Sequence, residues 1–312
     1  MDEIDVVTTT GDAALVELGR RPAPAPEAGQ AVVSIEAFSV NRGEILLLEG
    51  GRTDGYGKDV AGCVVQAAAD GTGPPRGSSV VAHLDGGGWA RSVAVDASRL
   101  VRLPEGLAPT AAAALPLSGL TALRLVRIAR SEGARRVLLT GASGGVGHLF
   151  AELAAADGIA VTAVTRSSER GARLRELGAD RVVTSVDDAG DGFDVAFESV
   201  GGETTGHALT ALRTGGLLVW LGQASRRPAT LDFFAVANGP GDVRLRSFAY
   251  WSDAAHDVED LVTLVGLAAA GRLHPEIGMK APWTDTARVL AAVRDREVVG
   301  NAVLTVTGQV PA

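Results

Sequence analysis

The chain has 312 residues, of which 46% are hydrophobic and 21% charged. This is the composition of a globular protein long enough for one large or two ordinary domains. Its net charge of −8 provides no basic field for nucleic acid or an anionic membrane, so neither is predicted as a partner. The N-terminus lacks a secretory signal, no stretch approaches the roughly 18 to 20 apolar residues of a membrane helix, and the single cysteine fits a reducing compartment. We therefore expect a cytoplasmic protein.

The first 110 or so residues are expected to be β-rich. Alternating apolar runs are separated by Gly, Pro and Asp turns, which is typical of a small barrel or sandwich. These runs cover residues 31–37, 59–65 and 78–83. Residues 38–44 are predicted to be a loop leading into a short helix over 45–48. Cys63 falls within an apolar strand and is interpreted as a core residue rather than a nucleophile.

From Thr110 the pattern changes to alternating strands and helices, which predicts a doubly wound parallel sheet. The predicted strands are 136–140, 159–165, 181–184, 193–198 and 216–222, and the helices between them are 148–156, 168–177 and 204–212. Residues 225–242 are predicted to be a long loop, followed by helices over 258–270 and 284–294 and a last strand over 302–306. We expect an α/β protein.

A glycine-rich turn follows the first of these parallel strands and opens a helix. Such a turn lets backbone N–H groups and the helix N-terminus approach a pyrophosphate. The predicted coenzyme-binding residues of this turn are Gly141, Ala142, Ser143, Gly144, Gly145, Val146 and Gly147. The turn also fits the pattern of short-chain dehydrogenases, but two features argue against that class. A full domain's length precedes the turn, and neither Tyr56 nor Tyr250 is followed four positions later by lysine. His148, next to the turn, is interpreted as solvated.

The residues after the second parallel strand predict NADPH rather than NADH. An NAD site places a carboxylate about twenty residues past the glycine turn, where this chain has Arg166. Arginines with nearby hydroxyls suit a 2′-phosphate, and a solvated helix face is the alternative interpretation. Thr165, Ser167 and Arg170 complete this predicted subsite. Ser199, Val200, Gly222 and Gln223 follow later strand ends, which face the coenzyme in such a sheet.

The order of parts resembles the medium-chain dehydrogenase/reductase superfamily, and its zinc-independent quinone oxidoreductase (zeta-crystallin-like) branch is the most similar. The resemblance is carried by residues 37–44, 57–62, 115–122, 141–147, 198–202 and 300–304. It implies a GroES-like catalytic domain (1–115 and 256–312), a Rossmann NADPH-binding domain (116–255), an active site in the cleft between them, and a homodimer.

The resemblance also implies site residues. It places Asn41 beside the nicotinamide, where the amide could donate to a developing enolate, although an ordinary loop-capping asparagine is equally compatible with the sequence. Tyr56 is a candidate proton donor, with solvent as the alternative. Thr121 matches a threonine near the nicotinamide, and Asn301 stands where the family usually has a lysine. Lys58 and Asp59 are interpreted as structural or rim residues.

No metal is predicted, because Asn41 occupies the position of a catalytic cysteine in zinc enzymes and the five histidines lack metal-site spacing. The predicted function is therefore zinc-independent hydride transfer from NADPH to a quinone or to the β-carbon of an α,β-unsaturated carbonyl. The alternatives are a dedicated enoyl or ketone reductase that tailors a biosynthetic intermediate, and an NADPH-binding sensor or structural protein without turnover.

Overall fold

The computed structural model describes residues 2–12 and 14–306 and divides into two compact units. The β-rich unit comprises the residues up to 120 together with those from 255 onward, and the central unit comprises residues 121–254. The boundaries predicted from the sequence were 115 and 256.

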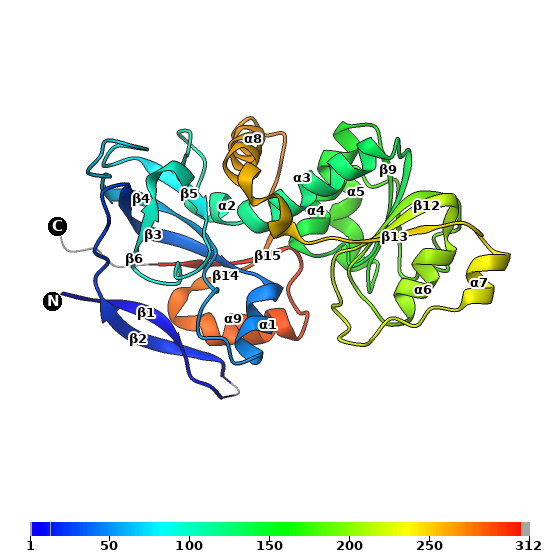
Figure 1. Ribbon diagram of the computed structural model, residues 1–312, viewed down its shortest axis with the longest axis horizontal. Helices are drawn as coiled ribbons and strands as arrows, with labels where there is room; N and C mark the ends of the chain where they lie inside the picture. Colours follow the sequence, from blue (N-terminus) through cyan, green and yellow to red (C-terminus); the bar gives the residue numbers. More distant parts are fainter. Residues whose placement is uncertain (1, 13, 307–312) are drawn as a thin grey trace. The chain divides into compact units, whose positions relative to one another are not determined.

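The β-rich unit is built on a seven-stranded sheet in the order β14-β15-β3-β4-β5-β7, with β6 also pairing with β3. Its strands are β3 (Gln30–Val40), β4 (Asp59–Gln66), β5 (Ser79–His83), β6 (Ser92–Asp96), β7 (Val101–Arg102), β14 (Ile277–Pro282) and β15 (Asn301–Thr305). The hairpin of β1 (Glu3–Thr9) and β2 (Val16–Pro22) adds a second, two-stranded sheet. The last strand thus returns to pair with β3 near the start of the chain (Figure 1).

Four main helices accompany these sheets: α1 (Arg42–Glu49), α2 (Pro109–Ala113), α8 (Asp257–Ala269) and α9 (Thr286–Arg294). Fully buried aromatic residues hold the core together, since Phe38 and Trp89 stack with their ring centroids 5.9 Å apart. Burying two large rings in this way is among the strongest apolar contributions available to a small domain.

The central unit contains a six-stranded parallel sheet in the order β10-β9-β8-β11-β12-β13. The strands are β8 (Arg136–Leu139), β9 (Ala160–Val164), β10 (Arg181–Val183), β11 (Phe193–Glu198), β12 (Leu212–Trp220) and β13 (Arg244–Ser247). The helices are α4 (Gly145–Ala156), α5 (Ala172–Glu176), α6 (Glu203–Thr210), α7 (Phe233–Asn238) and most of α3 (Pro116–Ser131), whose first five residues belong to the β-rich unit. The strand order reverses between β8 and β11, which is the position where such sheets bind dinucleotides. The predicted α/β fold is confirmed.

Several local predictions were wrong. Residues 225–242 are not all loop, because the Asp232 carboxylate accepts hydrogen bonds from two backbone N–H groups and starts α7. The helix predicted over 168–177 is divided into a 3-10 turn (Glu169–Gly171) and α5. His148 is fully buried rather than solvated, with Nδ1 2.9 Å from the carbonyl oxygen of Gly144. Strands β1, β2, β6, β7, β13 and β14 were not individually predicted.

Within the described residues, no helix is both long and apolar enough to cross a membrane.

Candidate functional site

The turn after β8 can be made only by glycine at two positions. Gly141 has a φ of +62°, and a Cβ atom there would lie 2.5 Å from Ser199 Oγ. A Cβ atom on Gly147 would lie 2.1 Å from the carbonyl oxygen of Ala142, so the first turn of α4 packs directly on the loop. This compact backbone leaves the N-terminus of α4 open to a ligand, and oriented N–H groups at such a helix end favour an anion.

A buried carboxylate holds the loops after β8 and β11 together. Glu198 is fully buried and accepts hydrogen bonds from four groups: Thr140 Oγ1 (3.1 Å), Val200 N (2.7 Å), Gly201 N (3.1 Å) and Thr205 Oγ1 (2.9 Å). Ser199 also links the two loops, because its Oγ donates to the carbonyl oxygen of Thr140 at 3.0 Å. A buried charge with this many donors is stabilised. Glu198 therefore fixes the loops at the point where the strand order reverses.

Two arginines and a hydroxyl gather beside the glycine turn. Arg170 Nε donates to Ser143 Oγ at 3.4 Å. Burial lowers the pKa of Arg170, and the charge of the nearby Arg166 lowers it further. Thr165 is buried and donates to the carbonyl oxygen of Ser167 at 2.8 Å, which shapes the turn that carries Arg166. Two neighbouring cations repel each other, so a dianionic phosphate bound between them would remove that cost.

The remaining predicted residues of the central unit lie at the carboxyl ends of strands or on α3. A Cβ atom on Gly222 would lie 3.2 Å from the carbonyl oxygen of Ser199, so the ends of β11 and β12 are adjacent. Val200 is half-buried and Gln223 is exposed, whereas Thr121 is buried on α3. The structure thus brings the glycine turn, the arginines and the later strand ends into one unit.

In the β-rich unit, Asn41 precedes α1 and is buried. Its Nδ2 donates to Ser39 Oγ at 3.2 Å and to Asp59 Oδ2 at 2.8 Å. An amide nitrogen has two hydrogens, and the carboxylate can only accept, so the orientation of the amide is fixed. Both hydrogens are therefore used inside the unit. To donate to a developing enolate the amide would have to give up one of these contacts, so the role of Asn41 beside the nicotinamide stays a prediction.

Asp59 is the centre of this buried network. Besides Asn41, its carboxylate accepts from Ser39 Oγ at 2.9 Å and from Leu117 N at 3.3 Å, and its Oδ1 lies 2.7 Å from His83 Nδ1. The structural interpretation of Asp59 made from the sequence fits these contacts. The pairing with His83 was missed, because only the register of β4 against β5 places the two residues opposite each other.

Glu44 is a second buried carboxylate that sequence analysis missed. It accepts hydrogen bonds from the backbone N–H groups of Asn41 (2.7 Å), Gly57 (2.7 Å) and Lys58 (3.0 Å). Burial, and to a lesser extent the charge of Asp59, raise the pKa of Glu44 to about 7 despite these donors. Glu44 thus ties the loop before α1 to the segment before β4. A glutamate three residues after an N-cap asparagine was the available signal.

Tyr56 is half-buried against Trp89, with ring centroids 5.2 Å apart. Burial raises the pKa of its phenol, which keeps the hydroxyl protonated near neutral pH and able to donate. Asn301 has two contacts within the β-rich unit. Its Oδ1 accepts from Ser118 Oγ at 2.8 Å and its Nδ2 donates to the carbonyl oxygen of Glu276 at 3.0 Å, while its predicted contact with the coenzyme stays a prediction.

Burial raises the pKa of the Cys63 thiol, and the charge of Glu36 adds to this, in keeping with a packed residue rather than a nucleophile. Among the residues with a described position, no three His, Cys, Asp or Glu side chains form a group that could hold a metal ion.

The chain is similar to several known proteins. Residues 145–265 match the family described as "Zinc-binding dehydrogenase". The quinone oxidoreductase of Pseudomonas syringae pv. Tomato superposes with a TM-score of 0.85 at 23% identity, covering 97% of this chain and 99% of that one. Escherichia coli quinone oxidoreductase complexed with NADPH also gives a TM-score of 0.85, at 20% identity, covering 97% of this chain and 100% of that one.

A curated relative is much longer than this chain. The mycocerosic acid synthase-like polyketide synthase of Mycobacterium tuberculosis is 32% identical over 235 residues, which cover 70% of this chain. This chain matches only 11% of the length of that relative.

Proposed function

From its fold and the match of residues 145–265, we propose that the chain is an NADPH-dependent reductase of the medium-chain dehydrogenase/reductase superfamily, as its sequence predicted. We propose as acceptors a quinone or the β-carbon of an α,β-unsaturated carbonyl. The observation that carries the coenzyme assignment is the grouping of Arg166, Arg170 and Ser143 beside the glycine turn. This grouping fits a 2′-phosphate, which NADH lacks.

The residues of the central unit fit the coenzyme in charge and shape. The compact turn at Gly141 and Gly147 would let the pyrophosphate approach the N-terminus of α4, and Arg166 with Arg170 would hold the 2′-phosphate. When bound, NADPH supplies the hydride. Glu198 keeps the loops after β8 and β11 fixed, so the coenzyme meets a preformed surface.

In the β-rich unit, the protein's own tasks are positioning and proton delivery. Asp59 orients Asn41, and Glu44 anchors the same loop through the Asn41 backbone. The protonated phenol of Tyr56 is our candidate for delivering a proton to the reduced acceptor, with solvent as the alternative source. No step of this proposal requires a metal ion.

The coenzyme assignment is tested by NADPH and NADH oxidation at 340 nm with para-quinones, ortho-quinones, enals and cyclic enones as acceptors. Arg166→Ala should reduce the preference for NADPH over NADH about 10- to 100-fold, because charged hydrogen bonds contribute about 1.5 to 3 kcal/mol. Arg175→Ala is the matched control, since Arg175 is exposed on α5 and donates to the carbonyl oxygen of Val182. An unchanged preference in Arg166→Ala would refute the assignment.

The relative that is a polyketide synthase favours a second candidate, reduction of the carbon–carbon double bond in an unsaturated acyl thioester. Turnover of crotonyl-N-acetylcysteamine with silence toward all quinones would select this dedicated enoyl reductase. NADPH binding by fluorescence, with no oxidation by any acceptor including the thioester, would select the non-catalytic sensor or structural protein instead. The predicted cytoplasmic location stays a prediction.

We also propose a homodimer formed through β13. This strand is the edge of the parallel sheet, and all four of its residues are exposed, which leaves its outer backbone available for pairing. Large exposed apolar side chains concentrate in the same part of the chain: Leu231, Phe233, Phe234, Leu245 and Trp251. Light scattering should give twice the chain mass of 31.8 kDa, and Phe234→Glu should shift it toward the monomer.

A further inference from the structure

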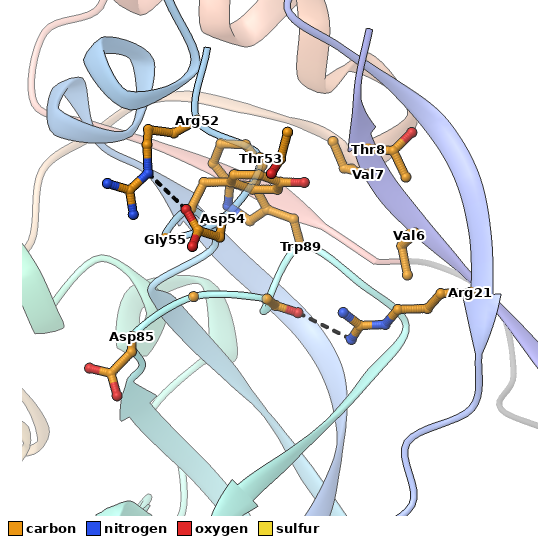
Figure 2. A pocket seen from close by; sticks show the side chains of 13 residues that line it. Val6, Val7, Thr8, Arg21, Arg52, Thr53, Asp54, Gly55, Asp85 and Trp89 are labelled. Carbon is orange, nitrogen blue, oxygen red and sulfur yellow. Dashed lines mark hydrogen bonds and ion pairs between the residues drawn. The ribbon is translucent and has the colours of Figure 1, made fainter. Parts of the chain in front are cut away.

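A cavity of about 570 Å³ lies wholly within the β-rich unit and has no part in the proposed coenzyme site. Its walls come from strands β1 and β2 and from two loops, residues 52–56 and 85–89 (Figure 2). The volume is within the range of about 300 to 1,000 Å³ that is usual for sites of small organic ligands.

Arg21 projects from β2 into this cavity and is half-buried. Its Nη2 donates to the carbonyl oxygens of Gly87 and Ser92, each at 3.2 Å. In the described part of the chain, no carboxylate lies within 4.0 Å of this guanidinium, and its Nε and Nη1 groups make no hydrogen bond. A partly buried cation without an anionic partner is costly, because two carbonyl dipoles do not neutralise a full charge.

The other charges around the cavity are neutralised in pairs. Arg52 Nε lies 2.9 Å from Asp54 Oδ1, and Asp85 is bound at 2.7 Å by Arg99. Figure 2 shows the Asp85 carboxylate directed away from Arg21. The cavity therefore has one uncompensated positive charge, which belongs to Arg21.

A second donor and an apolar surface complete the cavity. Tyr56 lines it, and no described residue accepts a hydrogen bond from its hydroxyl or donates one to it. Burial raises the pKa of Tyr56, the charge of Arg21 opposes that rise and the charge of Asp54 adds to it, so both charged groups are electrostatic neighbours of the phenol. Val6, Val7 and Trp89 form the apolar part of the wall.

We propose that this cavity binds a small amphipathic carboxylate, with its carboxylate oxygens on Arg21 and the Tyr56 hydroxyl and its apolar body against Val6, Val7 and Trp89. Guanidinium and hydroxyl donors match the geometry of a carboxylate, and a monoanion balances the single charge. A carboxylate held there would occupy the hydroxyl proposed above as the proton donor. Its binding is measured without coenzyme or turnover, so failure of this proposal and failure of the proposed reductase activity are distinguishable.

The test is calorimetric titration with sodium octanoate, with methyl octanoate as the uncharged probe of similar shape. Wild-type protein should bind octanoate at least 10-fold more tightly than the ester, and Arg21→Gln should weaken octanoate binding at least 10-fold. Arg20→Gln is the matched control, because the neighbouring Arg20 is exposed and lies beside Glu3 and Asp5. Its affinity for octanoate should equal that of the wild type.

Amide NMR of the wild-type protein keeps the test decisive if Arg21→Gln fails to fold. Octanoate should shift the amide signals of Gly86 and Gly87 and the Trp89 indole signal, while Gly266 in α8 stays unmoved. Absence of octanoate binding by the wild type would overturn the proposal, as would equal binding by Arg21→Gln or shifts confined to other parts of the chain.

Discussion

The buried carboxylate of Glu44 should give this protein an unusual dependence of stability on pH. Its pKa is about 7 in the folded protein, against an ordinary value of 4.5 in the unfolded chain. Each pH unit between the two corresponds to about 1.36 kcal/mol, so ionising Glu44 costs the folded state about 3 kcal/mol. Replacing the side chain by the neutral Glu44→Gln should remove this cost.

The direction of this pH dependence follows from the number of protons bound by the folded and unfolded states. Below pH 4.5 the carboxyl is protonated in both states and has no effect. Between pH 4.5 and 7 the folded state keeps a proton that the unfolded chain has lost, so stability falls as the pH rises. Above pH 7 the loss is complete and constant. Stability should therefore decrease with rising pH, the reverse of the usual salt-bridged carboxylate.

Urea unfolding of the wild type and Glu44→Gln between pH 4.5 and 8 measures this effect. The variant leaves Asn41 N without its acceptor, which lowers its stability by about 1 to 3 kcal/mol at every pH. The difference between the two proteins should still change by about 3 kcal/mol across the range. Glu49→Gln, at an exposed position on the same helix, is the control. Its difference in stability from the wild type should change by less than about 0.5 kcal/mol across the same pH range. Parallel wild-type and Glu44→Gln curves would refute the reasoning.

Two further predictions concern the candidate site. Gly147→Ala should abolish NADPH binding in a fluorescence titration and lower the melting temperature, because its Cβ would lie 2.1 Å from the Ala142 carbonyl oxygen. Gly266→Ala, which meets open space in α8, should instead raise stability by up to about 1 kcal/mol. Asp59→Asn should lower kcat about 10-fold with the KM for NADPH unchanged, since Asp59 acts through Asn41. A parallel rise in that KM would contradict this positioning role.

Local sequence patterns predicted much of the architecture for identifiable reasons. Apolar alternation and its change at Thr110 indicated the β-rich and parallel-sheet regions, and the glycine turn with Arg166 at its expected spacing indicated the coenzyme subsite. Strands β13 and β14 were not predicted, because they are largely polar or exposed and form only by pairing with β12 and β15. Fully exposed β13 has no inward apolar face for a pattern to report.

By itself, the sequence determined which residues can make the glycine turn and which segments alternate as strands and helices, because these depend on nearest neighbours along the chain. Only the tertiary structure decided the electrostatics of the site. Asp59 meets His83 and Asn41 through strand register, Glu44 meets Gly57 across a loop, and Arg21 lies in a cavity where no carboxylate of the described residues pairs with it. The energy of a buried charge depends on groups brought together from distant positions, which no local pattern records.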